Sequence, residues 1–311
     1  MIVPAKARVL LAGGARGDLV RRVQVALTDQ GFALGSADGL YGRNTEAAVK
    51  AFQQAQSLDV TGKVDKITWT QLLGIPVPTT EERALQLTAA FEGHGFTIAR
   101  GNWDGAGITW GIVGFTLRHG ELSQIILKIF SDNPALVQEA FGENVQELID
   151  VMNSSRAVQM QFANSISQGT TKIMIREPWR SAFKAFGEIA EVQALQLELA
   201  DEEYGRPSVQ TATRFGLKTE LGRALAFDVH VQNGGIKPAA QKEIVTALEQ
   251  MPATTELELR VIIANAVADA SRSYKEDVRA RKLTIAAGTG KVHGEAFVLS
   301  NWGLDEFPAD S

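Results

Sequence analysis

The chain has 311 residues, enough for two domains that each bury a core, and its 45% hydrophobic and 22% charged content is that of an ordinary folded protein. A formal net charge of −5 without a basic stripe argues against nucleic acid as the main partner. There is no cysteine, and the four histidines fall in no metal-binding pattern, so we expect no disulfide, no metal and no cofactor.

Three short helices are predicted within the first 75 residues, because valine, leucine and phenylalanine recur there at helical spacing. Each predicted helix begins at a residue whose side chain can cap it, and two of them end at a glycine. The predicted N-caps are Asp18, Asn44 or Thr45, and Asp65, and the predicted ends are Gly31 and Gly74.

An internal repeat precedes the second and third of these helices. "DGLYGRNT" (38–45) and "TGKVDKIT" (61–68) both place glycine second and threonine eighth. Glycine suits a turn that needs a positive φ, and threonine suits the start of a helix.

This pattern resembles the peptidoglycan-binding domain 1 family, a three-helix module that binds bacterial cell walls. The alternative is a generic three-helix bundle. The resemblance covers residues 14–74 and rests on Gly17, Asp18, Val23, Gln24, Leu27, Asp38, Gly39, Gly42, Thr45, Val49, Phe52, Gln53, Leu58, Gly62, Thr68, Trp69 and Leu72. It implies that peptidoglycan is a partner and that the wall-binding residues include Asp38, Gly39, Tyr41, Gly42, Thr45 and Trp69.

The predicted domains are a peptidoglycan-binding domain at 1–75, a linker at 76–82 and a catalytic domain at 83–311. The linker prediction rests on the two prolines and two threonines of "GIPVPTTEE" (74–82). Residues 1–75 carry nine basic and six acidic side chains, a net charge of 9 − 6 = +3. A mildly cationic module suits an anionic wall polymer.

The remainder of the chain reads as mostly helical. One helix, "ERALQLTAAFEG", is predicted to end near Glu92. The exception to the helical pattern is "GITWGIVGFT" (107–116), where β-branched and aromatic residues between glycines predict short strands or an extended cleft wall.

Two acids precede this stretch, one at a helix end and one on a small loop, which is how a glycosidase can flank one sugar bond. Glu92 follows a phenylalanine at a helix end, where a raised pKa would suit a general acid, and Asp104 lies among polar residues, where it would stay ionised. Thr109 could hold a water molecule with its hydroxyl group. From the residues alone, such a pair could equally be two surface acids, since the chain has 36 of them.

"DGAGITWGIVGFTLRHGEL" (104–122) resembles the family-46 chitosanases, a branch of the lysozyme-like superfamily with the approximate motif D-G-R-G-x-T-x-G-I-x-G-F…G-D. The resemblance implies a mainly α fold, with a predominantly helical, lysozyme-like α+β catalytic domain. It assigns Glu92 as general acid, Asp104 as base and Thr109 as the residue that positions water in an inverting reaction. The matching residues are Asp104, Gly105, Gly107, Thr109, Gly111, Ile112, Gly114, Phe115 and Gly120.

Three departures from the family pattern bear on the substrate. The family's arginine two positions after the aspartate is Ala106 here, and its later aspartate, associated with binding the glucosamine amino group, is Glu121. The twelve-residue interval between Glu92 and Asp104 is also shorter than expected for a chitosanase. We therefore expect an N-acetylated glycan to be preferred over chitosan.

Four further residues are candidates for substrate binding or its support: Trp103, Glu121, Asp228 and Arg281. The resemblance implies that Asp228 supports the catalytic glutamate through an arginine, for which Arg281 is the predicted partner, although Asp228 could equally be a satisfied core acid. Trp103 and Trp110 have flat faces that could stack on sugar rings, with core packing the alternative for Trp110. His94 is expected to be a surface residue.

The sequence thus predicts a monomeric peptidoglycan hydrolase of the endolysin type, with no membrane span, that cleaves the glycan backbone. Because no secretory signal is evident, we expect it to stay in the cytoplasm of the host cell until it is released to the wall. The alternatives are a chitosanase with a wall-binding module and a non-catalytic wall-binding protein.

Overall fold

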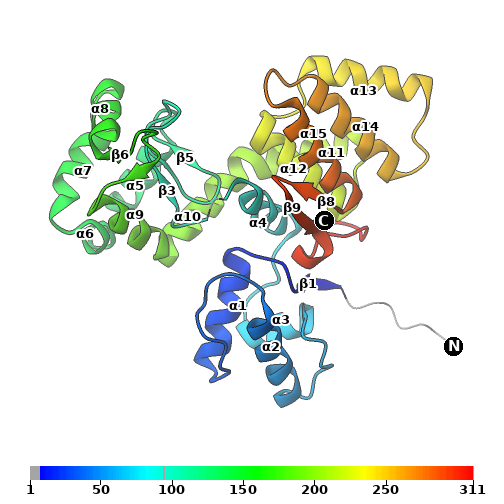
Figure 1. Cartoon of the computed structure of the whole chain (residues 1–311), viewed down its shortest axis with the longest axis horizontal. Helices are drawn as coiled ribbons and strands as arrows, with labels where there is room; N and C mark the ends of the chain where they lie inside the picture. The colour runs from blue at the N-terminus through cyan, green and yellow to red at the C-terminus, as the bar shows by residue number, and fades with distance from the viewer. Residues whose placement is uncertain (1–7, 94, 311) are drawn as a thin grey trace. The chain divides into compact units, whose positions relative to one another are not determined.

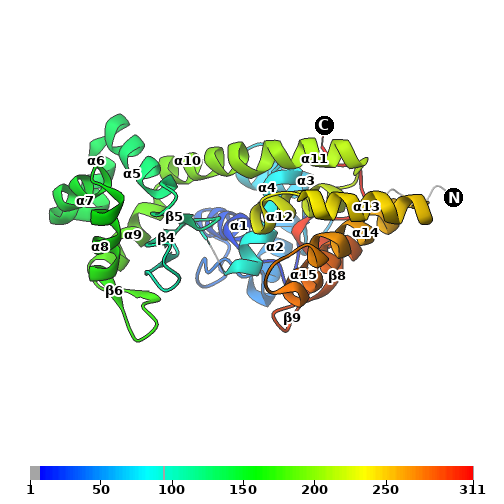
Figure 2. The same ribbon diagram turned by 90° about the horizontal axis from the view of Figure 1, so that it is seen from above.

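The computed structural model describes residues 8–93 and 95–310, which form two compact units (Figures 1 and 2). The first unit contains the chain up to Phe91 together with the chain from Glu202, and the second unit is Glu92–Asp201. Helices dominate both units and the sheets are small, so the predicted mainly α fold is confirmed. No helix formed by the described residues is long and apolar enough to cross a bilayer.

The N-terminal part of the first unit is a three-helix bundle with one small antiparallel sheet. Its core is formed by apolar side chains from all three helices, among them Val23, Phe52 and Trp69, which are almost fully buried. The elements are β1 (Val9–Leu11), α1 (Asp18–Asp29), α2 (Arg43–Ala55), β2 (Val64–Asp65) and α3 (Lys66–Leu73).

The helix ends agree with the predicted ones in part. Asp65 caps α3 by accepting a hydrogen bond from the Thr68 amide, and Gly74 ends it in the left-handed conformation, as predicted. The predicted N-caps of the first two helices are wrong, because Gly17 and Gly42 occupy those positions and provide no side-chain cap. Backbone groups can satisfy a helix start without a side-chain oxygen, and sequence alone does not reveal this.

The internal repeat has a structural cause, which is a buried glutamine on the preceding helix that bonds to each copy. Gln24 accepts a hydrogen bond from the Gly39 amide (2.7 Å) and donates one to the Thr45 hydroxyl (2.9 Å). Gln53 repeats these bonds with Gly62 (2.9 Å) and Thr68 (3.1 Å). Both glycines have a positive φ, as the sequence predicted. The repeated glycine and threonine therefore brace each turn against a helix of the bundle.

The rest of the first unit is a helical body with a β-hairpin at its edge. The hairpin was not predicted, because its short strands lie among glycines and polar residues. The elements are α4 (Thr80–Glu92, whose last residue belongs to the second unit), the later part of η2 (Asp201–Gly205), α11 (Arg206–Phe215), α12 (Glu220–Asn233), α13 (Pro238–Gln250), α14 (Glu256–Asp269), α15 (Lys275–Ala287), β8 (Thr289–Val292), β9 (Glu295–Val298) and η3 (Leu299–Trp302).

The N-terminal bundle is attached to this helical body by specific hydrogen bonds. The Ala12 amide donates to the Asn301 carbonyl (3.0 Å), and the Asn301 side chain donates to the Gly13 carbonyl (2.8 Å). The Asp18 amide donates to the Gln86 side chain (2.9 Å). Residues 76–79 form neither helix nor strand, and α4 begins at Thr80. The domain boundaries at 75 and 82 stay a prediction.

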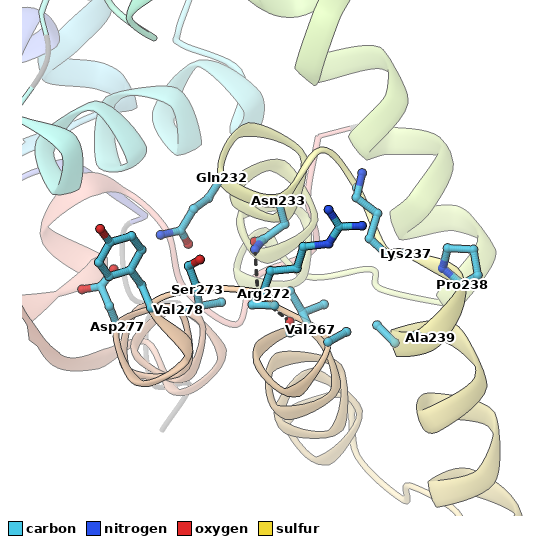
Figure 3. A pocket seen from close by; sticks show the side chains of 15 residues that line it. Gln232, Asn233, Lys237, Pro238, Ala239, Val267, Arg272, Ser273, Asp277 and Val278 are labelled. Carbon is cyan, nitrogen blue, oxygen red and sulfur yellow. Dashed lines mark hydrogen bonds between the residues drawn. The ribbon is translucent and has the colours of Figure 1, made fainter. Parts of the chain in front are cut away.

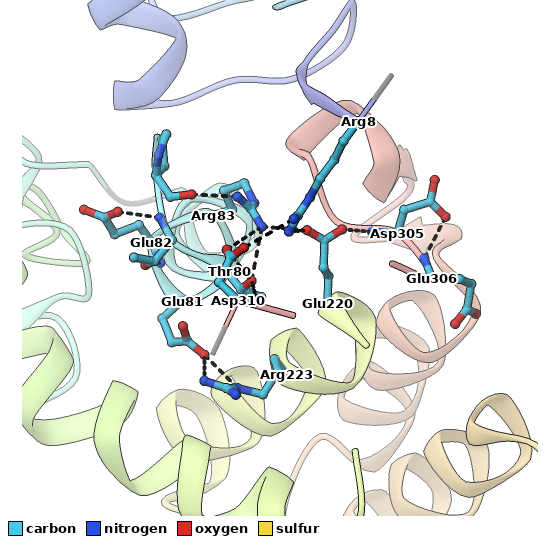
Figure 4. A network of polar contacts seen from close by, with 12 residues as sticks. Arg8, Thr80, Glu81, Glu82, Arg83, Glu220, Arg223, Asp305, Glu306 and Asp310 are labelled. Atoms are coloured by element: carbon cyan, nitrogen blue, oxygen red, sulfur yellow. Dashed lines mark hydrogen bonds and ion pairs between the residues drawn. The ribbon is translucent and has the colours of Figure 1, made fainter. Parts of the chain in front are cut away.

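A buried ion-pair network joins the start of α4 to the start of α12 (Figure 4). Glu220 is fully buried and accepts from Arg83 at 2.6 Å, from Arg8, and from the Asp305 amide at 3.0 Å. Burial lowers the pKa of Arg83 to about 10. Because a buried charge without a partner is costly, each member of this network holds the others in place.

The second unit places a small sheet beside a helical layer. An aromatic cluster that includes Phe141, Trp179, Phe183 and Phe186 forms much of its core. Its elements are β3 (Ala99–Arg100), β4 (Thr109–Trp110), β5 (Phe115–Thr116), α5 (Glu121–Asp132), α6 (Pro134–Phe141), η1 (Gly142–Asn144), α7 (Val145–Met152), α8 (Arg156–Ile166), β6 (Ser167–Gln168), β7 (Met174–Ile175), α9 (Trp179–Glu188) and α10 (Ala190–Ala200). The strands predicted within 107–116 are confirmed.

Glu220→Gln should destabilise the protein by about 3–5 kcal/mol, because it removes the fully buried charge partner of Arg83 and leaves only the more distant, exposed Asp310. Urea unfolding at neutral pH, followed by circular dichroism, measures the loss. Glu46→Gln, which removes an exposed carboxylate from the pair with Lys50, is the matched control and should leave the unfolding midpoint unchanged. Equal unfolding midpoints for the two variants would contradict the role of Glu220.

Candidate active site

Thr109 lies on the central strand of the three-stranded sheet in the second unit. β4 pairs with β3 on one side, where Thr109 faces Arg100, and with β5 on the other, where Thr109 faces Thr116. Its side chain is half-buried, so the hydroxyl group remains within reach of solvent. The next residue, Trp110, is fully buried against Phe186 and anchors the strand.

Asp104 lies on the tight loop between β3 and β4. Gly105 and Gly107 on either side of Ala106 both have φ of +84°, a conformation that favours glycine. One carboxylate oxygen of Asp104 accepts a hydrogen bond from the Ala106 amide (2.9 Å), and the side chain is exposed. Since the other oxygen has no partner among the described residues, it is available to a water molecule or a sugar.

Asn102 fixes the conformation of this loop through three hydrogen bonds. Its side-chain oxygen accepts from the Gly107 amide (2.9 Å), and its side-chain nitrogen donates to Asn164 on α8 (3.0 Å). Its own amide donates to the Ser167 hydroxyl (2.8 Å). Three fixed bonds leave the loop little freedom, so Asp104 is pre-positioned.

Glu92 is the last residue of α4 and the first residue of the second unit. The Arg100 guanidinium donates to the carbonyl oxygens of Glu92 and Gly93, both at 3.2 Å. Because Arg100 also pairs with Thr109 across the sheet, one side chain links the helix end to the strand that carries Thr109. This bond ties the backbone at Glu92 to the sheet that carries Thr109, and the Asp104 loop connects two strands of the same sheet.

The two tryptophans differ in what they can contact. Trp103 is 53% exposed beside Asp104 and can stack on a sugar ring. Trp110 is buried and donates its indole hydrogen bond to the Phe183 carbonyl (3.1 Å), so it is a core residue.

Glu121 is occupied by the protein itself. It begins α5, and one carboxylate oxygen accepts from the Thr116 amide (3.1 Å) and hydroxyl (3.2 Å). This couples α5 to β5 and leaves the other oxygen for a substrate.

Arg118, which the sequence analysis missed, donates to the Gly105 carbonyl at 3.3 Å, so a guanidinium lies beside the Asp104 loop although position 106 is alanine. No local sequence pattern reveals this contact, because residues 105 and 118 are brought together only by the folding of the sheet β3–β4–β5.

Asp228 and Arg281 lie together in the first unit, fully buried. The Arg281 guanidinium donates to both Asp228 oxygens (2.6–3.0 Å), Lys282 adds a second cation, and the Thr88 hydroxyl donates from α4 (2.9 Å). Burial alone would raise the pKa of Asp228, but the charges and hydrogen bonds of Arg281 and Lys282 outweigh it and hold the pKa well below the usual range. Arg281 also lies over the ring of Phe91, 5.1 Å from its centre, directly before Glu92 in the chain.

Two family models match the chain. The peptidoglycan binding domain model matches residues 16–72, and the glycosyl hydrolase family 46 model matches residues 88–257, more than half of the chain. The chain belongs to glycosyl hydrolase family 46. Both families were predicted from the sequence, and both predictions are confirmed.

Similar proteins carry the name chitosanase. The chitosanase of Bacillus subtilis (strain 168) is 27% identical over 158 residues, which cover 50% of this chain and 51% of that protein. The chain therefore spans about half the length of the curated relative it matches. The family 46 chitosanase of Gynuella sunshinyii, solved with chitotetraose, is 16% identical with a TM-score of 0.48, over 72% of this chain and 99% of that one. The native chitosanase of Bacillus subtilis MY002 is 19% identical with a TM-score of 0.47, over 71% of this chain and 96% of that one.

Within the peptidoglycan binding domain, most predicted wall-binding residues are structural. Tyr41 is buried and donates its hydroxyl to the Gly62 carbonyl (2.9 Å), and burial raises its pKa well above the usual range. Trp69 is buried and donates to the Pro76 carbonyl (3.0 Å). Thr45 and Gly39 are buried beside Gln24. The buried rings of Tyr41 and Trp69 stabilise the domain through these bonds and are covered from a surface polymer.

The predicted residues that do face a hollow are Asp38, Gly42 and Thr45. They line a cavity of about 460 Å³ together with Arg43 and Asn44 from the start of α2. Hydrogen bonds from the Leu40 amide and the Gln24 side chain lower the pKa of Asp38, so this carboxylate stays ionised. This cavity is the part of the predicted wall-binding set that a ligand can reach.

The remaining sequence predictions concern histidine and metals. His94 lies outside the described residues. Within residues 8–93 and 95–310, no three histidine, aspartate or glutamate side chains are grouped closely enough to hold a metal ion.

Asp228→Asn should destabilise the protein by about 3–5 kcal/mol at pH 7, because Arg281 and Lys282 are left buried without a counter-charge. Since the pKa of Asp228 is depressed in the folded state, its contribution is fully present above the unfolded pKa near ~3.9 and is lost as pH falls further. The stability gap between wild type and variant should therefore shrink below about pH 4.

Urea unfolding at pH 7, 5 and 3 tests this pH dependence. Asp132→Asn, an exposed partner of Lys128, is the control and should show a small gap at every pH. A gap for Asp228→Asn that stays constant down to pH 3 would contradict the assignment.

Proposed function

We propose that the protein is a glycoside hydrolase that cleaves the backbone of a glucosamine-containing polymer, with Glu92 as general acid and Asp104 as base. The observation that carries this proposal is the family 46 match over 88–257, which contains the loop and sheet that hold both acids. The hydrogen-bonded loop around Asp104 supports it, because the structure fixes one carboxylate oxygen and leaves the other available.

The proposed mechanism divides the work between the two acids. The protonated Glu92 donates its proton to the leaving glycosidic oxygen, and the ionised Asp104 takes a proton from the attacking water. Thr109 accepts or donates a hydrogen bond that orients this water from the centre of the sheet. Such an inverting reaction needs the two carboxyl groups roughly 6.5–9.5 Å apart, which leaves room for the water.

Chitosan, the polymer of glucosamine, is the first substrate we propose. The similarity to the Bacillus subtilis chitosanase favours it. Arg118 supplies a guanidinium beside the Asp104 loop, and Glu121 supplies an anionic group for an amino sugar, as the aspartate of the family motif is expected to do.

Peptidoglycan is the second candidate, and the match of residues 16–72 to the peptidoglycan binding domain favours it. Attachment of a wall-binding domain to the catalytic part would concentrate the enzyme on its substrate. In this case we propose that the protein acts as an endolysin, which is released from the host cytoplasm to degrade the wall.

The two candidates are separated by one comparison of substrates. We expect wild-type protein to release reducing ends from chitosan at least tenfold faster than from purified peptidoglycan, measured in parallel at equal mass of polymer. The reverse order, with clearing of permeabilised bacteria, would establish the peptidoglycan reaction instead. Proton NMR of the same time course should show the α anomer first, and an initial β anomer would exclude inversion.

Glu92→Gln should lower the hydrolysis rate by about 10²–10⁴, because the amide cannot donate the proton. Asp104→Asn should have an effect of the same order, since the amide cannot accept one. Glu139→Gln, an exposed acid on α6 in the same unit, is the matched control and should keep full activity. More than about a tenth of wild-type activity in Glu92→Gln would show that the helix-end acid is structural.

A further inference from the structure

Another cavity lies within the first unit, and its lining residues all fall between Gln232 and Val278 (Figure 3). Its volume is about 700 Å³, and its walls are the end of α12, the start of α13, the end of α14 and the loop that leads into α15. None of the residues proposed for hydrolysis or for wall binding lines it. A cavity of this size accommodates one or two sugar rings.

Two cationic side chains line this cavity. Arg272 is exposed and has no hydrogen-bond or ion-pair partner among the described residues. Lys237 donates one hydrogen bond, to the Gly234 carbonyl (2.8 Å), and Figure 3 shows both side chains on the same side of the cavity. The carboxylate in the lining, Asp277, contacts His293 (2.7 Å). Neither cationic group forms an ion pair with a carboxylate among the described residues.

Asn233 contributes a polar group that the protein leaves unsatisfied. Its side-chain nitrogen donates to the Ser271 hydroxyl (3.4 Å), while its side-chain oxygen is buried and has no partner among the described residues. Turning the amide by half a rotation would leave the nitrogen unpaired instead. A buried polar atom without a partner costs about 1–3 kcal/mol, which a ligand hydroxyl or amide group would recover.

Tyr274 adds an aromatic surface to the lining. It is 83% exposed and has a φ of +54°, which a bulky residue rarely adopts. Residues held in such a conformation cluster at ligand sites, where the surrounding structure sets the direction of the side chain. An exposed ring of this kind is suited to the apolar face of a sugar.

We propose that this cavity binds a sugar residue that carries a carboxylate, such as the muramic acid of peptidoglycan. The carboxylate pairs with Arg272 and Lys237, a ring substituent satisfies Asn233, and the sugar face rests on Tyr274. An arginine fork matches a carboxylate in two places, whereas the ammonium group of glucosamine would be repelled by both cations. This inference rests on the proposed function only in that the ligand is a glycan, since binding requires no hydrolysis.

The test measures binding of the disaccharide N-acetylglucosaminyl-N-acetylmuramic acid by isothermal titration calorimetry. The full-length protein carries Glu92→Gln, so that the ligand is not cleaved. In this background, Arg272→Glu and Lys237→Glu should each weaken binding at least tenfold, and Arg272→Lys should weaken it less. Lys218→Glu is the matched control, because it makes the same charge change on an exposed residue of the same unit outside the cavity, and it should leave the affinity unchanged.

Two further arms make the outcome specific. The neutral disaccharide N,N′-diacetylchitobiose should bind Arg272→Glu and its parent equally, and raising the salt concentration should weaken only the acidic disaccharide. Unchanged affinity of correctly folded Arg272→Glu and Lys237→Glu for the acidic disaccharide would overturn the proposal, as would tighter binding of glycerol phosphate than of the disaccharide. If the wild type hydrolyses neither polymer while the acidic disaccharide still binds as expected, the proposed function is rejected and the binding proposal stands.

Discussion

The buried carboxylate of Asp228 is the constraint on which the position of α4 depends. Thr88 donates to it from the middle of the helix, while Arg281 neutralises it and covers the ring of Phe91 near the helix end. At the other end, Arg83 is fixed by the fully buried Glu220. Buried charges therefore hold α4 at both ends within the first unit. Glu92, which ends α4, is the acid that we propose as proton donor, and acid catalysis depends on a donor that is held in place.

A second constraint acts within the loop that carries Asp104. A short chain segment can turn back on itself twice only where residues accept a positive φ, which explains Gly105 and Gly107. The hydrogen bonds of Asn102 then remove the freedom that glycine would otherwise add. The loop is therefore rigid, although its glycines lose much backbone entropy on folding. The glycines allow the tight turns of this loop, and the Asn102 side chain holds the loop in that conformation.

The sequence was a good guide to elements with strong local signals. The helix that ends at Glu92, the strands around Thr109, and the Asp65 cap all follow from spacing or capping chemistry that a few neighbouring residues determine. The hairpin β8–β9 was missed because its residues give no alternating pattern, and its stability comes from packing against α15. Long-range contacts of this kind leave little trace in a local window.

The same limit applies to side chains. Tyr41 and Trp69 match a wall-binding family and look like exposed aromatic contacts, yet both are buried and hydrogen-bonded to carbonyl groups. A family motif contains both the residues that contact a ligand and the residues that hold the fold together. The motif alone does not tell the two kinds apart. Arg118 shows the converse, because its guanidinium reaches the Asp104 loop from thirteen residues away and no motif position marks it.

Charge is the property that best separates the two substrates, since chitosan is a polycation and peptidoglycan carries carboxylates. Around the loop that carries Asp104, Arg118 supplies a cation, and Glu121 at the start of α5 supplies a carboxylate, so the second unit offers groups of both signs to either polymer. The cavity with Arg272 and Lys237 is different, because two cations that form no ion pair with a carboxylate among the described residues favour an anionic ligand and penalise an amino sugar. Under these proposals, the polymer that is accepted depends on a few charged side chains outside the proposed reacting pair.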